Sequence, residues 1–230
     1  MSYNRAIVPE TYPSKDELTR DMVGIGMLFA EHPKKNPNIE NTLIAASLEG
    51  VEGEDYRTLS LLVDWLQIHI ERINADRLIH LVESLKSKRT KCFWAAVAHW
   101  KKKDRRFKKL TNSYRGPRLD LFSAGTNFLI KRSGEDERFS GTPLRVPAKT
   151  LRHRPQDILS PFELAKRHDV YRSRLTIGPT YRADMWAIVE RQPDISAAEL
   201  ARRSFGSFAT AWQVKKDWTT LNQRKETNHV

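Results

Sequence analysis

The chain contains one cysteine, Cys92, among its 230 residues, so it cannot form an internal disulfide. A single thiol fits a reducing compartment. No run of 18 apolar residues occurs, which excludes a typical membrane-spanning helix. Residues 1–17 have no apolar stretch of the kind that secretory signals carry. We therefore expect a cytoplasmic protein with no membrane partner.

The common local signatures of catalysis and nucleotide binding are also missing. The sequence has no GxxxxGK[ST] phosphate loop, GxGxxG, HExxH or GxSxG. The seven histidines are scattered, and Cys92 with His99 supplies too few ligands for zinc. We therefore expect no metal, no cofactor and no enzymatic activity. A nuclease or modifying enzyme whose site is assembled from distant residues is kept as a third hypothesis.

Positive charge is abundant and unevenly placed. The formal net charge is +12, which favours a polyanionic partner, most simply nucleic acid. Residues 1–85 hold 8 Lys/Arg against 14 Asp/Glu, whereas residues 86–230 hold 32 against 14. An acidic front and a basic back indicate different partners for the two parts of the chain.

The acidic part has the apolar periodicity of several short helices. We expect helices at 14–31, 39–48, 55–73 and 78–85, joined by short loops. In the third, an apolar face is expected to be buried while Asp64, Gln67 and Glu71 face the solvent. This part is predicted to be a helical scaffold that docks a protein partner or forms a homodimer.

Residues 86–109 are the most basic element. An apolar helix carrying Phe93, Val97 and Trp100 is flanked by two clusters of positive charge. Such clusters suit contacts with phosphate groups, although a strongly solvated helix end would have the same composition. The candidate phosphate-binding residues here are Lys88, Arg89, Lys101, Lys102, Lys103, Arg105, Arg106, Lys108 and Lys109.

The segment 134–160 lies between the basic element and the C-terminal helices. A polar loop ends near residue 141, and basic and apolar residues then alternate between prolines. This pattern predicts a short edge strand or an extended basic strap. Its phosphate candidates are Arg145, Lys149, Arg152 and Arg154.

Residues 182–218 divide into three helical pieces. The first ends at Pro193, and Ser196 with Glu199 forms a capping-box pattern that begins the second. Gly206 supplies a turn, and Ser207 is placed to cap the third. The expected order is therefore a helix, a short helix, a tight turn and a final helix.

This stretch resembles helix-turn-helix DNA-binding proteins at the superfamily level. The resemblance rests on Ala201 within the first motif helix and on the small and hydroxyl residues of 207–210. One departure is that the glycine stands at Gly206, one place later than usual, with Phe205 in its place. The resemblance implies that the last helix enters the major groove of DNA.

The final helix would then present one polar face to the bases. Residues spaced about three apart lie on one side, with side chains that suit base edges and phosphates. The predicted base-reading residues are Ser207, Thr210, Gln213 and Lys216. Flanking phosphate candidates are Arg202, Arg203 and Lys215. Phe208 and Trp212 are expected to pack against Leu200 and Trp186.

These observations predict a mainly α protein whose acidic N-terminal helical domain is followed by a basic helical region and a helix-turn-helix, with room for one short strand pair. The expected parts are 1–133, a linker or strap at 134–160, and 161–230. The function favoured is binding of double-stranded DNA, as a transcriptional repressor or a DNA-binding antitoxin. The alternative is a nucleic-acid-binding subunit of a larger complex with little sequence specificity, and RNA remains open as its ligand.

Overall fold

Polar side chains that accept hydrogen bonds from the first free backbone N–H groups begin many of the helices. Asn38 caps one helix by accepting from the N–H of Asn41 at 3.0 Å, and Ser87 caps another through Thr90. Ser160 and Glu163 form the complete capping box expected from their spacing.

The computed structural model describes residues 7–226, with side chains described up to residue 222.

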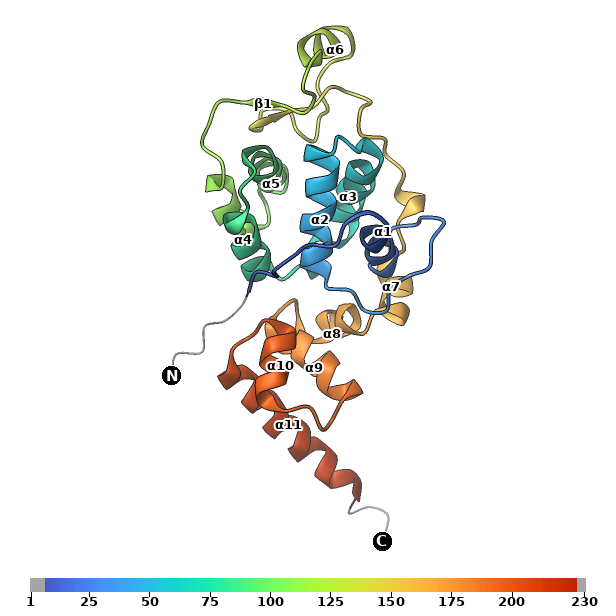
Figure 1. Ribbon diagram of the computed structural model, residues 1–230, viewed down its shortest axis with the longest axis vertical. Coiled ribbons are helices and arrows are strands. Elements are labelled where there is room, and N and C mark those ends of the chain that lie inside the picture. Colours follow the sequence, from blue (N-terminus) through green and yellow to red (C-terminus); the bar gives the residue numbers. More distant parts are fainter. Residues whose placement is uncertain (1–6, 227–230) are drawn as a thin grey trace.

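The protein is mainly α-helical, as expected (Figure 1). No described helix is both long enough and apolar enough to cross a membrane. The helices are α1 (Lys15–Gly24), α2 (Ile39–Glu52), α3 (Tyr56–His69), α4 (Ala75–Ser84), α5 (Lys88–Trp100), α6 (Thr126–Ser133), α7 (Pro161–Arg167), α8 (Asp169–Ile177), α9 (Tyr181–Arg191), α10 (Ala197–Ser204) and α11 (Phe208–Glu226). Short 3-10 segments lie at η1 (Ile70–Arg72), η2 (Arg105–Asn112) and η3 (Pro155–Asp157).

The larger core lies among α1–α5 and receives side chains from as far along the chain as Tyr171 in α8. Its two largest side chains are the indoles of Trp65 and Trp94, which are fully buried. Each indole N–H is satisfied: Trp65 donates to the Ile25 carbonyl at 2.7 Å and Trp94 to the Ser47 hydroxyl at 3.0 Å. The apolar faces of α1–α5 therefore pack together in one domain, which we call the body.

A two-stranded parallel sheet closes one end of this body. Strand β1 (Leu119–Asp120) pairs with β2 (Leu144–Arg145), so that Leu119 faces Leu144 and Asp120 faces Arg145. Helix α6 stands beyond the sheet at the far end of the molecule (Figure 1). The segment 134–160 contributes several core side chains, which are Phe139, Leu144, Val146, Leu151, Ile158 and Leu159.

The expected helix at 14–31 is wrong beyond its first turns. Ser14 accepts no capping hydrogen bond, and α1 ends at Gly24. The chain then turns through Gly26, whose φ of +95° favours glycine. A β-carbon on Gly24 would lie 2.4 Å from the Lys34 carbonyl oxygen, so this position admits the returning chain only because it is glycine.

Asp64 is a second correction. We expected its carboxylate to face the solvent, but Asp64 is 1% exposed. One carboxylate oxygen accepts from His153 Nδ1 at 2.8 Å, and the other accepts from the backbone N–H of Arg154 at 2.6 Å. These donors come from about 90 residues away, so the helical period of α3 gives no sign of them.

Helices α9–α11 form a smaller unit at the other end of the molecule (Figure 1). It packs on the body mainly through the contact between α8 and α9. The junction contains a buried ion network in which Arg174 of α8 is fully enclosed. Its guanidinium donates two hydrogen bonds to Glu40 of α2 and two to Asp184 of α9, at 2.6–3.0 Å. These bonds fasten the smaller unit to α2.

Candidate nucleic-acid interface

Helices α9, α10 and α11 pack pairwise around a small apolar core. The side chains at its centre are Met185, Val189, Ile195, Leu200, Ala201, Ala211 and Val214. Their spacing on each helix follows the 3.6-residue period, which is the signal that the sequence carried. The predicted order of three helices with a tight turn is present.

The turn between α10 and α11 explains the displaced glycine. Phe205 itself adopts the left-handed conformation, with φ of +57°, where a glycine is usual. Gly206 serves a different need, because a β-carbon there would lie 2.3 Å from the terminal methyl group of Met185 in α9. The glycine thus permits the turn to approach the first helix of the unit.

The capping box predicted for α10 is only half formed. Ser196 Oγ accepts from the N–H of Glu199 at 3.1 Å, as expected. The Glu199 carboxylate pairs with Arg202, where Nε lies 2.8 Å from a carboxylate oxygen. This contact lowers the pKa of Glu199 and commits Arg202, a predicted phosphate ligand, to an intramolecular pair.

The four predicted base-reading residues lie at the start of α11 and along its first three turns. Ser207, Gln213 and Lys216 are exposed and Thr210 is half-buried. Ser207 Oγ accepts from the Thr210 N–H at 3.1 Å, which caps the helix start. Gln213 donates to Asp217 at 2.8 Å, so its amide is already oriented by a neighbour. At 100° per residue, Gln213 and Lys216 share the outer face of α11, whereas Ser207 lies about 180° around the helix axis from Lys216. The four predicted residues therefore do not share one face.

Two aromatic side chains join this face, contrary to expectation. Phe208 and Trp212 are 43% and 53% exposed, whereas we expected both to pack inside the unit. Ala211 and Val214 fill the core, and at 100° per residue Trp212 turns away from it. Lys216 Nζ lies 5.6 Å from the centroid of the Trp212 ring, a cation–π contact. The exposed face of α11 is thus aromatic as well as polar.

The two remaining phosphate candidates of this unit make internal hydrogen bonds. Arg203 donates to Gln192. Lys215 donates to the carbonyl oxygens of Pro193 and Ile195, which closes the connection between α9 and α10. Both side chains therefore make contacts that hold the unit together.

The basic residues around α5 and η2 divide into two groups. Arg89, Lys101 and Arg106 make internal contacts; the Arg106 guanidinium reaches the carbonyl oxygens at the end of η1 at 3.2 Å. The second group is exposed, and its members form no ion pair with any side chain that the structure describes. They are Lys88, Lys102, Lys103, Arg105, Lys108 and Lys109, of which the last five form the basic loop.

The candidates in the segment 134–160 also differ in their surroundings. Arg145 pairs with Asp120 at 3.0 Å and donates to Asn127 at 2.6 Å. Lys149 is exposed and has a positive φ of 66°, which marks a sharp turn in the chain. Arg152 and Arg154 follow this turn on the surface of α3, where both are exposed.

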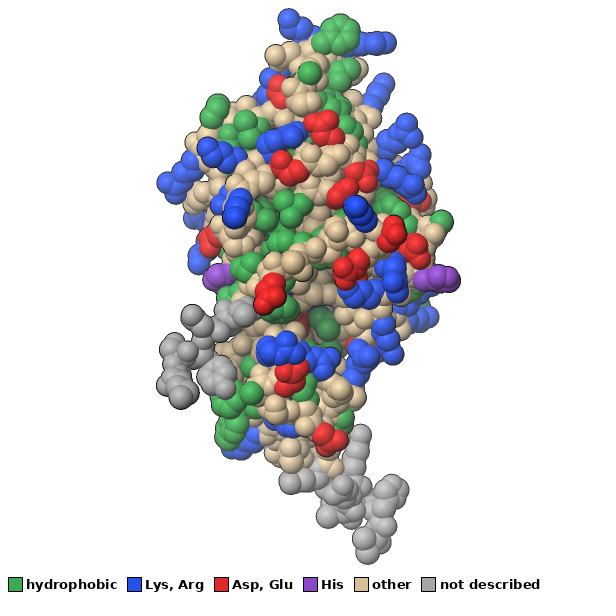
Figure 2. All heavy atoms as spheres, viewed as in Figure 1, with side chains coloured by type: hydrophobic (Ala, Val, Ile, Leu, Met, Phe, Trp, Pro, Cys, Tyr) green, Lys and Arg blue, Asp and Glu red, His purple; other side chains and the backbone are tan. Residues whose placement is uncertain are grey.

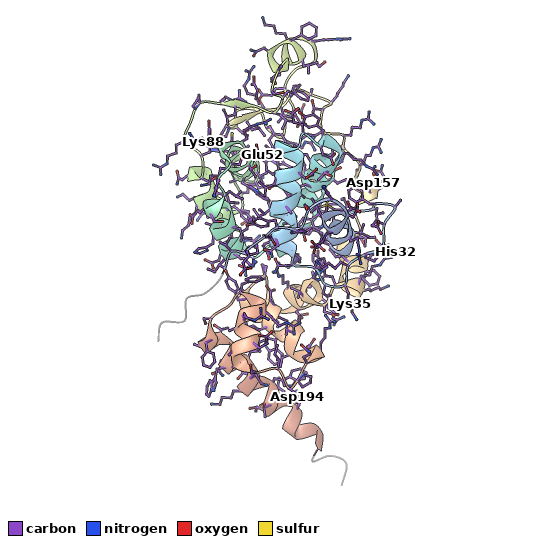
Figure 3. The ribbon with its side chains drawn as sticks, viewed as in Figure 1. His32, Lys35, Glu52, Lys88, Asp157 and Asp194 are labelled. Atoms are coloured by element: carbon purple, nitrogen blue, oxygen red, sulfur yellow. The ribbon has the colours of Figure 1, made fainter. Side chains whose placement is uncertain are left out.

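The candidate phosphate ligands do not gather on one face with α11. Figure 3 shows Lys88 and Asp157 on opposite sides of the body, while Asp194 marks the separate C-terminal unit. Residues 86–180 hold 24 Lys/Arg against 8 Asp/Glu, but residues 181–230 hold only 8 against 6. On the face drawn in Figure 2, Lys and Arg side chains likewise lie mainly over the body. The excess of positive charge thus lies in residues 86–180 and not in the unit of α9–α11.

Sequence reasoning missed the polar groups that are assembled from distant elements. They include the Asp64–His153 pair and the network of Arg174 with Glu40 and Asp184. The one available signal was the presence of Asp64 in an otherwise apolar part of α3.

Burial raises the pKa of the Cys92 thiol to about 11. Among the described residues, no three His, Cys, Asp or Glu side chains form a group suited to a metal ion.

Comparisons with protein-family models, with curated proteins and with solved structures found no match.

Proposed function

We propose that the protein binds double-stranded DNA through α11, which enters the major groove with its N-terminus first. The observation that carries the proposal is the three-helix unit in which the outer side of α11 presents its polar residues to the solvent. An α-helix fits the major groove of B-DNA, where each base pair has a distinct pattern of donors and acceptors.

The side chains of this face match different parts of the groove. The Gln213 amide both donates and accepts, which suits the edge of adenine. Ser207 and Thr210 lie at the start of the helix, where hydroxyl groups contact base edges or phosphates. Lys216 supplies a charge for phosphate or guanine, once it leaves the Trp212 ring. The exposed aromatic groups suit the methyl group of thymine.

The basic loop of α5 and η2 provides a further, sequence-independent attraction. Each lysine or arginine that neutralises a phosphate releases condensed counterions and strengthens binding at low salt. Because the loop lies on the body, its contribution to one DNA molecule depends on the path of the duplex past the body. The proposal assigns base reading to α11 and electrostatic attraction to the basic loop.

A protein that binds a defined DNA site through such a helix acts by occupying that site. We therefore extend the proposal to a transcriptional repressor or a DNA-binding antitoxin that controls its own gene. The exposed acidic residues near the end of α2, among them Glu49 and Glu52, belong to a surface proposed for a homodimer or another protein. A homodimer would place two α11 helices about one DNA turn apart.

A second candidate follows from where the charge lies. Because residues 86–180 carry most of the excess positive charge, the chain also fits a nucleic-acid-binding subunit of a larger complex. Such a subunit would bind DNA or RNA by its body and would discriminate little between sequences.

The Gln213→Ala variant separates the two candidates. Under the first, it should reduce the preference for the specific duplex by about 5- to 150-fold, since one good bidentate base contact contributes about 1–3 kcal/mol of discrimination. Gln156→Ala, which removes an exposed glutamine on the body, is the matched control and should change nothing. Fluorescence anisotropy with specific and scrambled duplexes measures both. Equal affinities for the two duplexes in the wild type would favour the second candidate.

A further inference from the structure

A cavity of about 310 Å³ lies between α3 and the segment that leads into η3, away from the helix-turn-helix. Three arginines from two separate stretches of the chain line it, namely Arg57, Arg152 and Arg154. Among the described residues that line it, the one acidic group is Asp157, whose carboxylate lies 4.0 Å from Arg154. The cavity therefore has a formal excess of two positive charges.

Buried groups of α3 hold the backbone at Arg152 and Arg154. The N–H of Arg152 donates to the Ser60 hydroxyl at 3.1 Å, and the N–H of Arg154 donates to the Asp64 carboxylate at 2.6 Å. The intervening His153 donates to the same carboxylate and lines a different cavity. Because successive side chains of an extended chain point to opposite sides, Arg152 and Arg154 face the same cavity.

The third arginine reaches the cavity from the start of α3. The guanidinium carbon of Arg57 lies 5.2 Å from the centroid of the Phe29 ring. This cation–π contact orients the Arg57 side chain without neutralising its charge. Neither Arg57 nor Arg152 forms an ion pair with a described side chain. Like charges that line one cavity repel one another, and an anion between them removes this repulsion.

The charge and the lining together define a class of ligand. A phosphomonoester carries a charge of about −1.5 to −2 at pH 7, which matches the excess of two positive charges. The planar guanidinium groups suit its oxygens, and the rest of the wall includes the ring of Tyr56 and the side chain of Leu61. The volume lies at the small end of ligand sites, which run from about 300 to 1,000 Å³.

We propose that the cavity formed by Arg57, Arg152 and Arg154 binds a small phosphomonoester with a ring-bearing body, of mononucleotide size. The guanidinium groups hold the phosphate, and Tyr56 and Leu61 contact the ring. This site is separate from α11 and does not depend on DNA binding by that helix.

Isothermal titration calorimetry of the full chain with AMP, adenosine and inorganic phosphate tests the proposal. AMP should bind at least about tenfold more tightly than adenosine, because the phosphate makes charge-assisted hydrogen bonds. AMP should also bind more tightly than inorganic phosphate, which lacks the ring. Arg57→Gln and Arg152→Gln should each weaken AMP at least about tenfold, whereas Arg115→Gln, at an exposed arginine outside the cavity, should leave it unchanged.

Several outcomes would overturn the proposal. Equal affinities for AMP and adenosine, or no binding of AMP, would show that the arginines do not bind the phosphate. Equal affinities for AMP and inorganic phosphate would show that the ring makes no contact with the cavity. Competition by a short duplex without terminal phosphates as strong as that by AMP would show a diester surface instead. Each variant should remain folded, because the three replaced arginines are exposed. Thermal unfolding of each variant checks this, so that a lost signal reports lost binding.

Discussion

The guanidinium of Arg77 lies over the ring of Phe205, with its central carbon 3.8 Å from the ring centroid. Arg77 belongs to α4 and is fully buried, whereas Phe205 forms the turn that precedes α11. Arg77 Nη2 also donates to the side-chain oxygen of Asn41 at 2.7 Å. This contact links the left-handed turn between α10 and α11 to the body.

A double-mutant cycle measures the strength of this link. Phe205→Ala and Arg77→Leu should each reduce the free energy of unfolding, and their coupling should be about 2 kcal/mol, the value for a desolvated cation–π pair. Urea unfolding of the four proteins gives the coupling energy. A coupling near zero would mean that the turn is held by its own unit and not by the body.

The buried network at the junction makes a larger prediction. Arg174→Met should lower the free energy of unfolding by about 3–5 kcal/mol, because Glu40 and Asp184 would lose their shared partner inside the protein. The matched control is Arg172→Met on the same helix, whose exposed pair with Asp169 should contribute less than about 1 kcal/mol. Similar losses for the two variants would contradict the assigned role of the network.

Local patterns predicted much of the fold because helix starts depend on neighbouring residues. The caps at Ser160 and Ser196 and the apolar period of α9 could be read directly from the sequence. The break after Gly24 was not predicted, because it depends on a carbonyl at Lys34 that packs there only in the folded chain. Asp64 was misplaced for the same reason, since its donors come from residues 153 and 154.

The candidate site was predicted in its order of helices but not in its surface. Spacing placed Gln213 and Lys216 on one side of α11, and the structure agrees. Hydrophobicity suggested that Phe208 and Trp212 were core residues, yet the small Ala211 and Val214 fill the unit. A unit of three short helices has room for few large side chains, so composition alone could not identify which ones remain outside.

Two buried histidines predict a loss of stability in mild acid. Burial lowers the pKa of His69 and of His168 to about 4. In His168, Nε2 donates to the Pro37 carbonyl at 3.0 Å and Nδ1 accepts from the Tyr171 N–H at 3.1 Å, an arrangement that requires the neutral ring. Since the pKa is near 6.5 in the unfolded chain, the unfolded state binds more protons between pH 6.5 and 4.

Stability should therefore be full above pH 6.5 and should fall as the pH decreases toward 4. At pH 5 the loss should be about 2 kcal/mol for each histidine. The His69→Gln variant should remove the contribution of His69 to this pH dependence of stability. The His32→Gln variant, at an exposed position, should keep the full pH dependence. Urea unfolding at pH 7.5 and pH 5 measures the difference, and a flat profile in the wild type would contradict neutral burial of the two rings.

The basic loop predicts the salt dependence of DNA binding. Replacing Lys102 and Lys103 with Gln should reduce the slope of log affinity against log salt concentration by about 1.8, or about 0.9 for each lost phosphate contact. Lys35→Gln, on the acidic half of the chain, should leave the slope unchanged. If the double variant keeps the full slope, the loop does not touch the phosphates and the DNA passes along another face of the body.

Fluorescence anisotropy with the duplex that lies immediately upstream of the protein's own gene tests the central claim most directly. The comparison uses a scrambled duplex and a single-stranded RNA at two salt concentrations. The proposed reading by α11 predicts that the upstream duplex binds at least ~10³ times more tightly than the scrambled one, the low end for specific recognition. Equal and steeply salt-dependent binding to all three would contradict a self-regulating DNA reader, and would assign the positive charge of the body to unspecific nucleic-acid contact.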